Sequence, residues 1–151
     1  MATYKEDSFN RGPWFSQAAG EVLSGITTDR IYADEDIVKL RRLAKGTILI
    51  NCRTISEELD AHATPTATAV LELVDGGTTT TLISYTAANF GATEILKETL
   101  TFASTNLLVS SESAYIQFRV TAAVATGQLC QIKHEFTVSA RAESLNPWSP
   151  A

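Results

Sequence analysis

Apolar and polar residues alternate one by one in several short segments of this 151-residue chain, and this period of two constrains its fold most. Successive side chains of a β-strand point to opposite faces of the sheet. The alternation therefore predicts strands with one buried face and one solvent-exposed face, as in antiparallel sheets. The candidate strands, from the clearest to the weakest, span residues 47–53, 68–74, 115–122, 130–139, 21–27, 36–40, 80–86 and 107–111. About eight short strands separated by turn signals favour a β-sandwich or barrel.

The apolar phase of each clear segment predicts which side chains face the core. Cys52 and His134 fall on this phase, so we expect a small buried thiol and a neutral, hydrogen-bonded core imidazole. The other predicted core positions are Ile48, Ile50, Ala69, Leu71, Leu73, Ile116, Phe118, Val120, Ala122, Cys130, Ile132, Phe136 and Val138. Two cysteines are no disulfide framework, and a bridge between them requires that their strands adjoin.

Glycine-containing turn signals separate the candidate strands, as at Gly76-Gly77 and at Asn89-Phe90-Gly91. The stretch 123–127 has one glycine and no following lysine, so it is expected to be a hairpin turn rather than a phosphate-binding loop. Residues 40–45 and 55–59 are the two candidates for helical turns. Neither approaches the roughly 12–15 residues that an isolated helix needs, so the predicted fold class is all-β.

Hydroxyl side chains carry much of the polarity, because the chain has 20 Thr and 12 Ser while charged residues make up only 19%. With 44% hydrophobic residues, it can bury a core without metal or disulfide staples. The net charge of −5 argues against nucleic-acid binding, which needs a basic face. No apolar run approaches the roughly 20 residues that span a bilayer, and the polar N-terminus does not resemble a signal peptide. The cysteine usage indicates synthesis in a reducing cytoplasm.

Both ends of the chain lack the alternation. Residues 1–20 contain a Gly-Pro breaker and the aromatic pair Trp14-Phe15, and residues 143–151 contain two prolines and Trp148. We therefore expect an extended N-terminal arm (1–20), a β-sandwich domain (21–142) and a C-terminal tail (143–151).

The residues do not predict a catalytic centre. The two histidines are His134, on a core phase, and His62, in a loop two residues after Asp60. Asp60 and His62 are the one candidate base pair for a small hydrolase. No nucleophile signature accompanies them, so a structural role is favoured.

Two acidic clusters, at 34–36 and 57–60, are the candidates for cation binding. Neither has the spacing of a calcium loop, and the single cysteines and histidines do not form a zinc set. We expect solvated loop edges, no metal and no cofactor; the alternative role for residues 34–36 is to cap or turn the chain into the segment 37–40.

Two features indicate binding to another macromolecule. One is the basic patch formed by Lys39, Arg41, Arg42 and Lys45, which is either a solvated connection or a docking surface for an acidic partner. The other is the set of aromatic residues in the arms, Trp14, Phe15 and Trp148. They either fold back onto their own sandwich or anchor in a neighbouring subunit, and we favour anchoring because tryptophan dominates interface hot spots.

Residues 33–50, ADEDIVKLRRLAKGTILI, resemble a pattern in structural proteins of tailed bacteriophages, in which an acidic turn leads into v-x-L-x-x-L-P-K-G-a-x-I. The segments 60–69, Gly76-Gly77 and 115–127 agree with it in order, while Ala44 stands where the pattern has proline. Such proteins are capsid decoration (cement) proteins with a jelly-roll-like β-sandwich. The resemblance implies a non-enzymatic protein on the capsid exterior, made in the host cytoplasm. It also implies binding to the major capsid protein, often as a homotrimer.

A second hypothesis is a carbohydrate- or receptor-binding module of the phage tail, because β-sandwiches host many unrelated functions. It requires an aromatic platform on the sandwich, for which Tyr85, Phe90 and Tyr115 are the candidates. A hydrolase built on Asp60 and His62 is the third.

Overall fold

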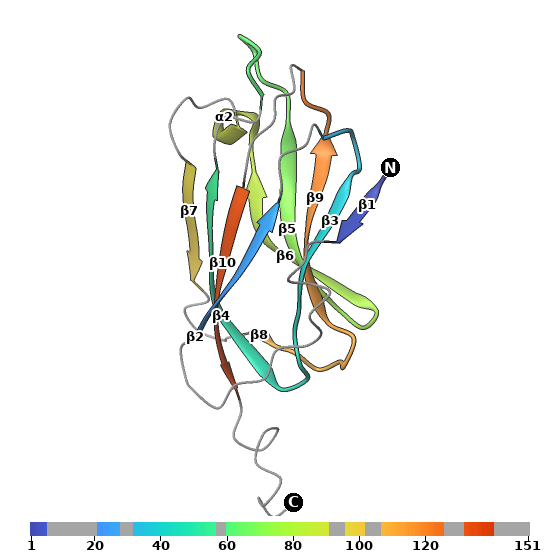
Figure 1. Ribbon diagram of the computed structural model, residues 1–151, viewed down its shortest axis with the longest axis vertical. Coiled ribbons are helices and arrows are strands. Elements are labelled where there is room, and N and C mark those ends of the chain that lie inside the picture. Colours follow the sequence, from blue (N-terminus) through green and yellow to red (C-terminus); the bar gives the residue numbers. More distant parts are fainter. Residues whose placement is uncertain are drawn as a thin grey trace, which may run out of the picture.

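The computed structural model describes residues 1–5, 21–27, 32–56, 60–90, 96–101, 107–125 and 132–140. These residues form two β-sheets that face each other (Figure 1). Along the chain the elements are β1 (Thr3–Lys5), β2 (Glu21–Thr27), β3 (Ile37–Arg42), β4 (Thr47–Ser56), β5 (Thr68–Asp75), β6 (Thr78–Tyr85), α2 (Ala87–Phe90), β7 (Leu96–Thr101), β8 (Leu107–Leu108), β9 (Tyr115–Ala122) and β10 (Ile132–Ala140).

The first sheet has the strand order β1-β3-β9-β5-β6, and the second sheet has the order β2-β10-β4-β7, with β8 also paired to β4. All described pairs are antiparallel except β1 with β3. The predicted all-β, antiparallel β-sandwich is therefore confirmed. Most successive strands, such as β2, β3, β4 and β5, lie in alternate sheets, so the chain passes repeatedly from one sheet to the other.

The connection between β9 and β10 corrects the predicted hairpin at 123–127. β9 pairs with β3 and β5, whereas β10 pairs with β2 and β4 in the other sheet. A glycine between two alternating segments marks a reversal of the chain but does not determine which strands pair. The hairpin that does form joins β5 and β6 through Gly76-Gly77, where a φ of 63° at Gly76 suits glycine.

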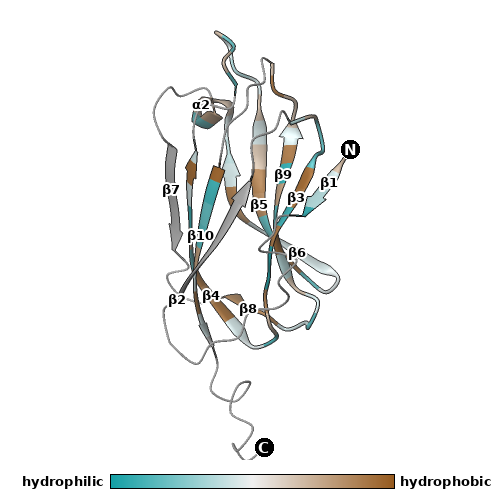
Figure 2. Cartoon of the chain, viewed as in Figure 1, coloured by the Kyte–Doolittle hydropathy of each residue, from teal (hydrophilic) through white to brown (hydrophobic). Residues whose placement is uncertain are grey.

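Aromatic rings from both sheets meet at the centre of the core. The Phe118 ring on β9 lies 5.9 Å from Tyr85, 6.2 Å from Phe90 and 5.5 Å from His134, measured between ring centroids. In Figure 2, strands such as β3, β9 and β10 carry both hydrophobic (brown) and hydrophilic (teal) residues, as the alternation requires. The predicted core residues of β5, β9 and β10 are confirmed for the most part; Ala122 is half-buried instead, and Cys130 lies outside the described residues.

The predicted core phase at the start of β4 is wrong. Leu49 is fully buried, while Ile48 and Ile50 are half-buried. The pairing with β10 skips one residue, because Asn51 lies opposite Thr137 and Leu49 lies opposite Val138. Ile50 is thus the extra residue of a β-bulge, which shifts the alternation so that Cys52 still faces the core.

The predicted helical turn at 40–45 is also wrong. β3 continues to Arg42, and a turn with φ of 87° at Gly46 leads into β4. The buried pair Leu40 and Leu43 mimics a helical spacing because the register with β9 is irregular between Lys39 and Arg41. The second candidate turn, at 55–59, begins inside β4, and its residues 57–59 lie outside the described part of the chain.

The first residues of the expected N-terminal arm belong to the sandwich. Thr3 to Lys5 form β1, which pairs in parallel with β3 at the edge of the first sheet. The amide of Ala2 donates to Asp36 Oδ1 at 3.0 Å, and the amide of Ile37 donates to the carbonyl of Ala2 at 2.8 Å. Trp14, Phe15 and Trp148 lie outside the described residues, and so does the expected C-terminal tail.

Candidate interaction surface

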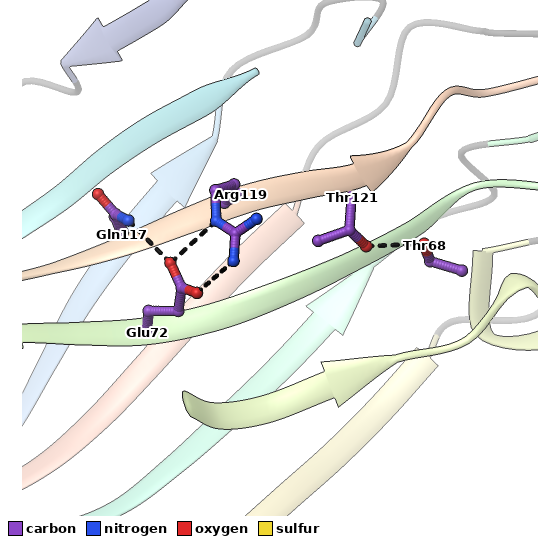
Figure 3. A network of polar contacts seen from close by, with 5 residues as sticks. All are labelled: Thr68, Glu72, Gln117, Arg119 and Thr121. Carbon is purple, nitrogen blue, oxygen red and sulfur yellow. Dashed lines mark hydrogen bonds and ion pairs between the residues drawn. The ribbon is translucent and has the colours of Figure 1, made fainter. Parts of the chain in front are cut away.

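A charged network occupies the outer face of the first sheet, and sequence analysis did not identify it. Glu72 on β5 lies opposite Gln117 on β9 and close to Arg119 (Figure 3). Arg119 donates from Nη2 to Glu72 Oε1 at 2.6 Å and from Nε to Oε2 at 3.2 Å, and Gln117 donates to Oε2 at 2.8 Å. A carboxylate held by a two-pronged guanidinium and an amide has a fixed geometry.

The network keeps Glu72 charged although the residue is only 3% exposed. Burial raises the pKa of Glu72, but hydrogen bonds from Arg119 and Gln117 outweigh it, and the pKa falls below its ordinary value. The same contact with Glu72 raises the pKa of Arg119. Because the two charges satisfy each other, the centre of this face is rigid and close to neutral.

Positive charge gathers nearer the β1 edge of the same face. The ammonium of Lys39 lies 4.5 Å from the centroid of the Tyr115 ring, within the range of a cation–π contact. Arg42 lies opposite Tyr115 in the β3–β9 register, and Lys5 lies opposite Lys39 in the β1–β3 register. Residues opposite each other in a sheet share a face, so Lys5, Lys39 and Arg42 form a basic strip.

The predicted basic patch is thus brought together only in part. Lys39 and Arg42 share the outer face, whereas Arg41 lies opposite the core residue Ile116 and so has the other phase. Lys45 is exposed in the turn that follows β3. Lys5 joins the strip through the parallel pairing of β1, which no local pattern in the sequence indicates.

Asp60 is not the solvated loop residue that the sequence predicts, because it is fully buried. Its Oδ2 accepts hydrogen bonds from the amides of Thr66 at 2.9 Å, Ala67 at 3.2 Å and Ala125 at 3.0 Å. Its Oδ1 accepts from the amide of His62 at 3.2 Å. A carboxylate that accepts several amide hydrogens organises a loop, and here it ties the segment before β5 to the segment after β9.

The Asp60–His62 pair of a hydrolase does not form. The exposed His62 ring directs Nδ1 at its own loop, 2.9 Å from the carbonyl oxygen and 3.0 Å from the amide nitrogen of Thr64, and it donates to the first or accepts from the second according to its tautomer. The carboxylate of Asp60 contacts the amide of His62 and not its ring. No arrangement of a base oriented by a carboxylate follows from these contacts.

Two further aspartates, Asp36 and Asp75, accept hydrogen bonds from backbone amides and so act as clasps between loops. Asp36 is 3% exposed and accepts from the amides of Ala2 and Ala33, so it is not solvated; it holds the turn into β3, which is the alternative role for residues 34–36. Asp75 accepts from the amides of Ser110 and Ser111 at 2.8 and 2.7 Å. These clasps fix the loops at the ends of the sandwich.

His134 is a core residue, as predicted. Its Nδ1 lies 3.1 Å from the hydroxyl of Thr54, which also bonds the hydroxyl of Tyr85. Among the described residues its Nε2 has no hydrogen-bond partner. Burial lowers the pKa of His134 to about 3, so the imidazole is neutral at pH 7. Burial likewise raises the pKa of Cys52 to about 12, so this thiol stays protonated and behaves as a small apolar side chain.

The candidate carbohydrate platform is not assembled. Tyr85 and Phe90 are 2% and 0% exposed in the core, whereas Tyr115 lies half-buried on the outer face. Within the described part of the chain, no group of three or more His, Cys, Asp or Glu side chains is close enough to hold a metal ion. The same residues include no helix long and apolar enough to cross a membrane.

Comparison with solved structures finds the same sandwich in phage capsids. A chain in the capsid of Ralstonia phage GP4 matches with a TM-score of 0.71 and 18% identity, over 93% of this chain and 99% of that chain. A chain in the capsid asymmetric unit of cyanophage Pam1 matches with a TM-score of 0.60 and 19% identity, over 86% of this chain and 91% of that chain.

A chain in the acid-stable capsid of Helicobacter pylori bacteriophage KHP30 matches with a TM-score of 0.54 and 11% identity, over 82% of this chain and 90% of that chain. No protein-family model and no curated protein matches the sequence. At these identities the likeness shows the fold. The fold is therefore one that phage capsids use for chains of about this length.

Proposed function

We propose that this chain is a non-enzymatic structural protein of a phage virion, a decoration (cement) protein that binds the outer surface of the capsid and stabilises the lattice of the major capsid protein. The observation that carries this proposal is the match to a capsid chain over 93% of this chain and 99% of the other. The match spans most of the length of both chains, so the two chains are similar in fold over most of their length.

The polar residues of the described chain support a structural role. Asp36, Asp60 and Asp75 bind loop amides, and Glu72 binds Arg119. Buried or clasped carboxylates of this kind fix loops and strands, and their lone pairs are not directed at a substrate. The strand orders of the two sheets, once the short β1 and β8 are set aside, agree with a jelly roll, a fold that viral capsid proteins use widely.

In this proposal the sandwich is a rigid platform, and the arms supply the anchors. Trp14, Phe15 and Trp148 insert into pockets of the neighbouring capsid subunits, where large aromatic side chains contribute most to binding. Binding that requires the assembled lattice stabilises that lattice by mass action. A homotrimer multiplies weak contacts through avidity.

The basic strip supplies a second contact. Lys5, Lys39 and Arg42 concentrate positive charge on one face of a chain whose net charge is −5. Such a local reversal of charge fits an acidic patch on the capsid and speeds encounter with it. Arg41 and Lys45 flank the strip and take a lesser part.

The proposal is tested by binding to purified shells of the phage that encodes the chain, measured by co-sedimentation. The double variant Trp14→Ala/Phe15→Ala keeps β1 and is expected to bind roughly 10- to 100-fold more weakly, as for the loss of hot-spot residues. Circular dichroism confirms that each variant retains its β-structure. Unchanged binding of this variant would refute the role of the arm, and no binding by the wild-type chain would refute the proposal as a whole.

The basic strip is tested in the same assay with Lys39→Glu/Arg42→Glu. Its binding is expected to weaken several-fold and to lose much of its dependence on salt. The matched pair for this test is Lys39→Glu and Lys133→Glu, because each reverses one charge, the first on the exposed face of the first sheet and the second on the exposed face of the second sheet. Equal losses in both variants would indicate a general charge effect instead. Binding to bacterial surface glycans, but not to shells, would favour the receptor-binding hypothesis.

A further inference from the structure

The four outermost strands of the sandwich differ in how their edges are protected. An edge strand presents unpaired backbone groups, and proteins discourage pairing there with charged residues, prolines or very short strands. β1 has three residues and includes Lys5, β2 includes Glu21, and β7 includes Lys97 and Glu98. β6, with the sequence TTTTLISY, contains no charged residue and no proline. Its pairing with β5 is irregular at one point, because Leu71 lies opposite Ile83 and Glu72 lies opposite Thr81, so Leu82 is the extra residue of a β-bulge. The run Thr78–Thr81 before the bulge pairs regularly with β5 and carries none of these protections.

Most side chains of the regular part of this edge are exposed. β6 has eight residues and pairs only with β5 among the described strands. Thr78, Thr79, Thr81 and Ser84 are exposed, while Leu82, Ile83 and Tyr85 hold the strand to the core. The β5–β6 turn projects from the body of the sandwich in Figure 1. A strand of this kind is a ready template for one more strand.

The character of β6 limits what can pair with it. Its exposed side chains are hydroxyls, so a complementary strand is uncharged and of high β-propensity, and Thr–Thr pairs across two strands are favourable. The chain's own terminal segments are poor candidates. Pro13 interrupts the first of them and Pro147 and Pro150 interrupt the last, and proline cannot donate to a strand ladder. The strand that fits best is β6 itself, because an antiparallel pair of identical strands is self-complementary about a two-fold axis.

We propose that β6 pairs with β6 of a second copy of this chain, so that the first sheets of two molecules join into one continuous sheet. This contact goes beyond the proposed capsid function and does not depend on it. A single pair of strands buries less area than a stable complex needs, so the contact is weak in dilute solution. It becomes effective where copies are held close together, as on a lattice of trimers, because the local concentration is high.

The contact is tested by sedimentation velocity of the purified full-length chain over a wide range of concentrations. Wild-type protein is expected to associate further as its concentration rises, beyond any trimer that forms through another surface. Thr79→Lys places a like charge on both strands of the pair and is expected to raise the dissociation constant of this step about tenfold or more. Thr79 is exposed and lies opposite Val74, so the variant is expected to fold.

Thr64→Lys is the matched control, since Thr64 is exposed in a loop and its backbone, not its side chain, contacts His62. Association by this control equal to that of wild type supports the proposal. Association by Thr79→Lys equal to that of wild type would overturn it, as would the absence of any concentration-dependent step in wild type.

Amide hydrogen exchange supplies a second, local readout in the same samples. At high concentration the amides of β6 are expected to exchange more slowly, because those that point away from β5 gain partners in the second copy. Amides of β1 serve as the internal reference at the other edge of the same sheet. Slower exchange at β1 but not at β6 would assign the contact to the wrong edge and overturn the proposal.

Discussion

Two polar clusters of this molecule each contain a side chain with little exposed surface, but they hold opposite kinds of group. His134 is 0% exposed in the core and is neutral, bonded to the hydroxyl of Thr54. Glu72 is 3% exposed on the outer face and is charged, bonded to Arg119 and Gln117. Burial alone therefore does not decide whether a group is ionised. Depth and partner both contribute. Glu72 lies at the sheet surface beside the partly exposed Arg119, whose opposite charge at hydrogen-bond distance offsets the cost of burial, whereas His134 lies in the core with a neutral hydroxyl as its partner.

The comparison predicts that the core cluster contributes more to stability than any surface pair of the same chemistry. Thr54→Val keeps the volume of the side chain but removes the hydroxyl that bonds both Tyr85 and His134. Because the loss of two buried hydrogen bonds is costly, we expect a loss of about 2–4 kcal/mol in the free energy of unfolding, measured by urea denaturation. Thr121→Val is the matched control, because it breaks the exposed hydroxyl pair with Thr68, at 2.7 Å, and is expected to cost under about 0.5 kcal/mol. Equal losses in the two variants would contradict the comparison.

Lowering the pH distinguishes the two clusters further, because their contributions to the free energy of unfolding are lost over different pH ranges. The pKa of His134 is about 3 in the folded chain and 6.5 without the fold. Below about pH 6.5, His134 therefore binds a proton in the unfolded chain but stays neutral in the folded chain. The stability that neutral His134 contributes is complete above that pH and is lost as the pH falls towards 3, by about 1.4 kcal/mol for each pH unit.

The measurement is the free energy of unfolding between pH 7 and pH 4.5, in wild type and in His134→Phe. The wild-type curve is expected to fall by about 2–3 kcal/mol over this range, and the variant curve to be flatter. A second variant, Thr54→Val, retains the histidine and is expected to keep the slope. A slope that survives in His134→Phe would assign the acid sensitivity to other groups.

The strands were largely predictable from the sequence, and the errors have local causes. The core residues of β9 and β10 follow from strict alternation, because one face of each strand packs against the opposite sheet. At β4 a bulge at Ile50 shifts the phase, and a bulge leaves no mark in the alternation until the partner strand is known. β1 and β7 were missed because three and six largely polar residues give too short a pattern.

The candidate surface was less predictable, because its contacts join distant parts of the chain. The run containing Lys39 and Arg42 is visible in the sequence, but its division between two faces depends on an irregular register with β9. Glu72 and Arg119 are 47 positions apart, and Asp60 reaches an amide 65 positions away. The usable signal was a lone Glu72 within an otherwise apolar segment, since such a residue on a strand requires a partner.

The Glu72 network gives the smallest and most selective of these effects. Glu72→Gln removes the charge that Arg119 faces and is expected to cost about 1–2 kcal/mol at pH 7. The pKa of Glu72 is lowered in the folded chain, so its contribution is present above about pH 4.5 and is lost as the pH falls further. The wild-type advantage over Glu72→Gln is therefore expected to shrink below pH 4.5, after most of the His134 effect has developed.

Glu135→Gln is the control for this last step. Glu135 also pairs with basic side chains, Lys133 at 2.9 Å and Arg53 at 3.5 Å, but in a more solvated setting on the second sheet. Exposed ion pairs of this kind contribute little, so its loss is expected to cost under about 0.5 kcal/mol. If Glu135→Gln cost as much as Glu72→Gln, the two-pronged contact with Arg119 would have no special value. Burial beside a fixed partner would then not distinguish the outer face of the first sheet from that of the second.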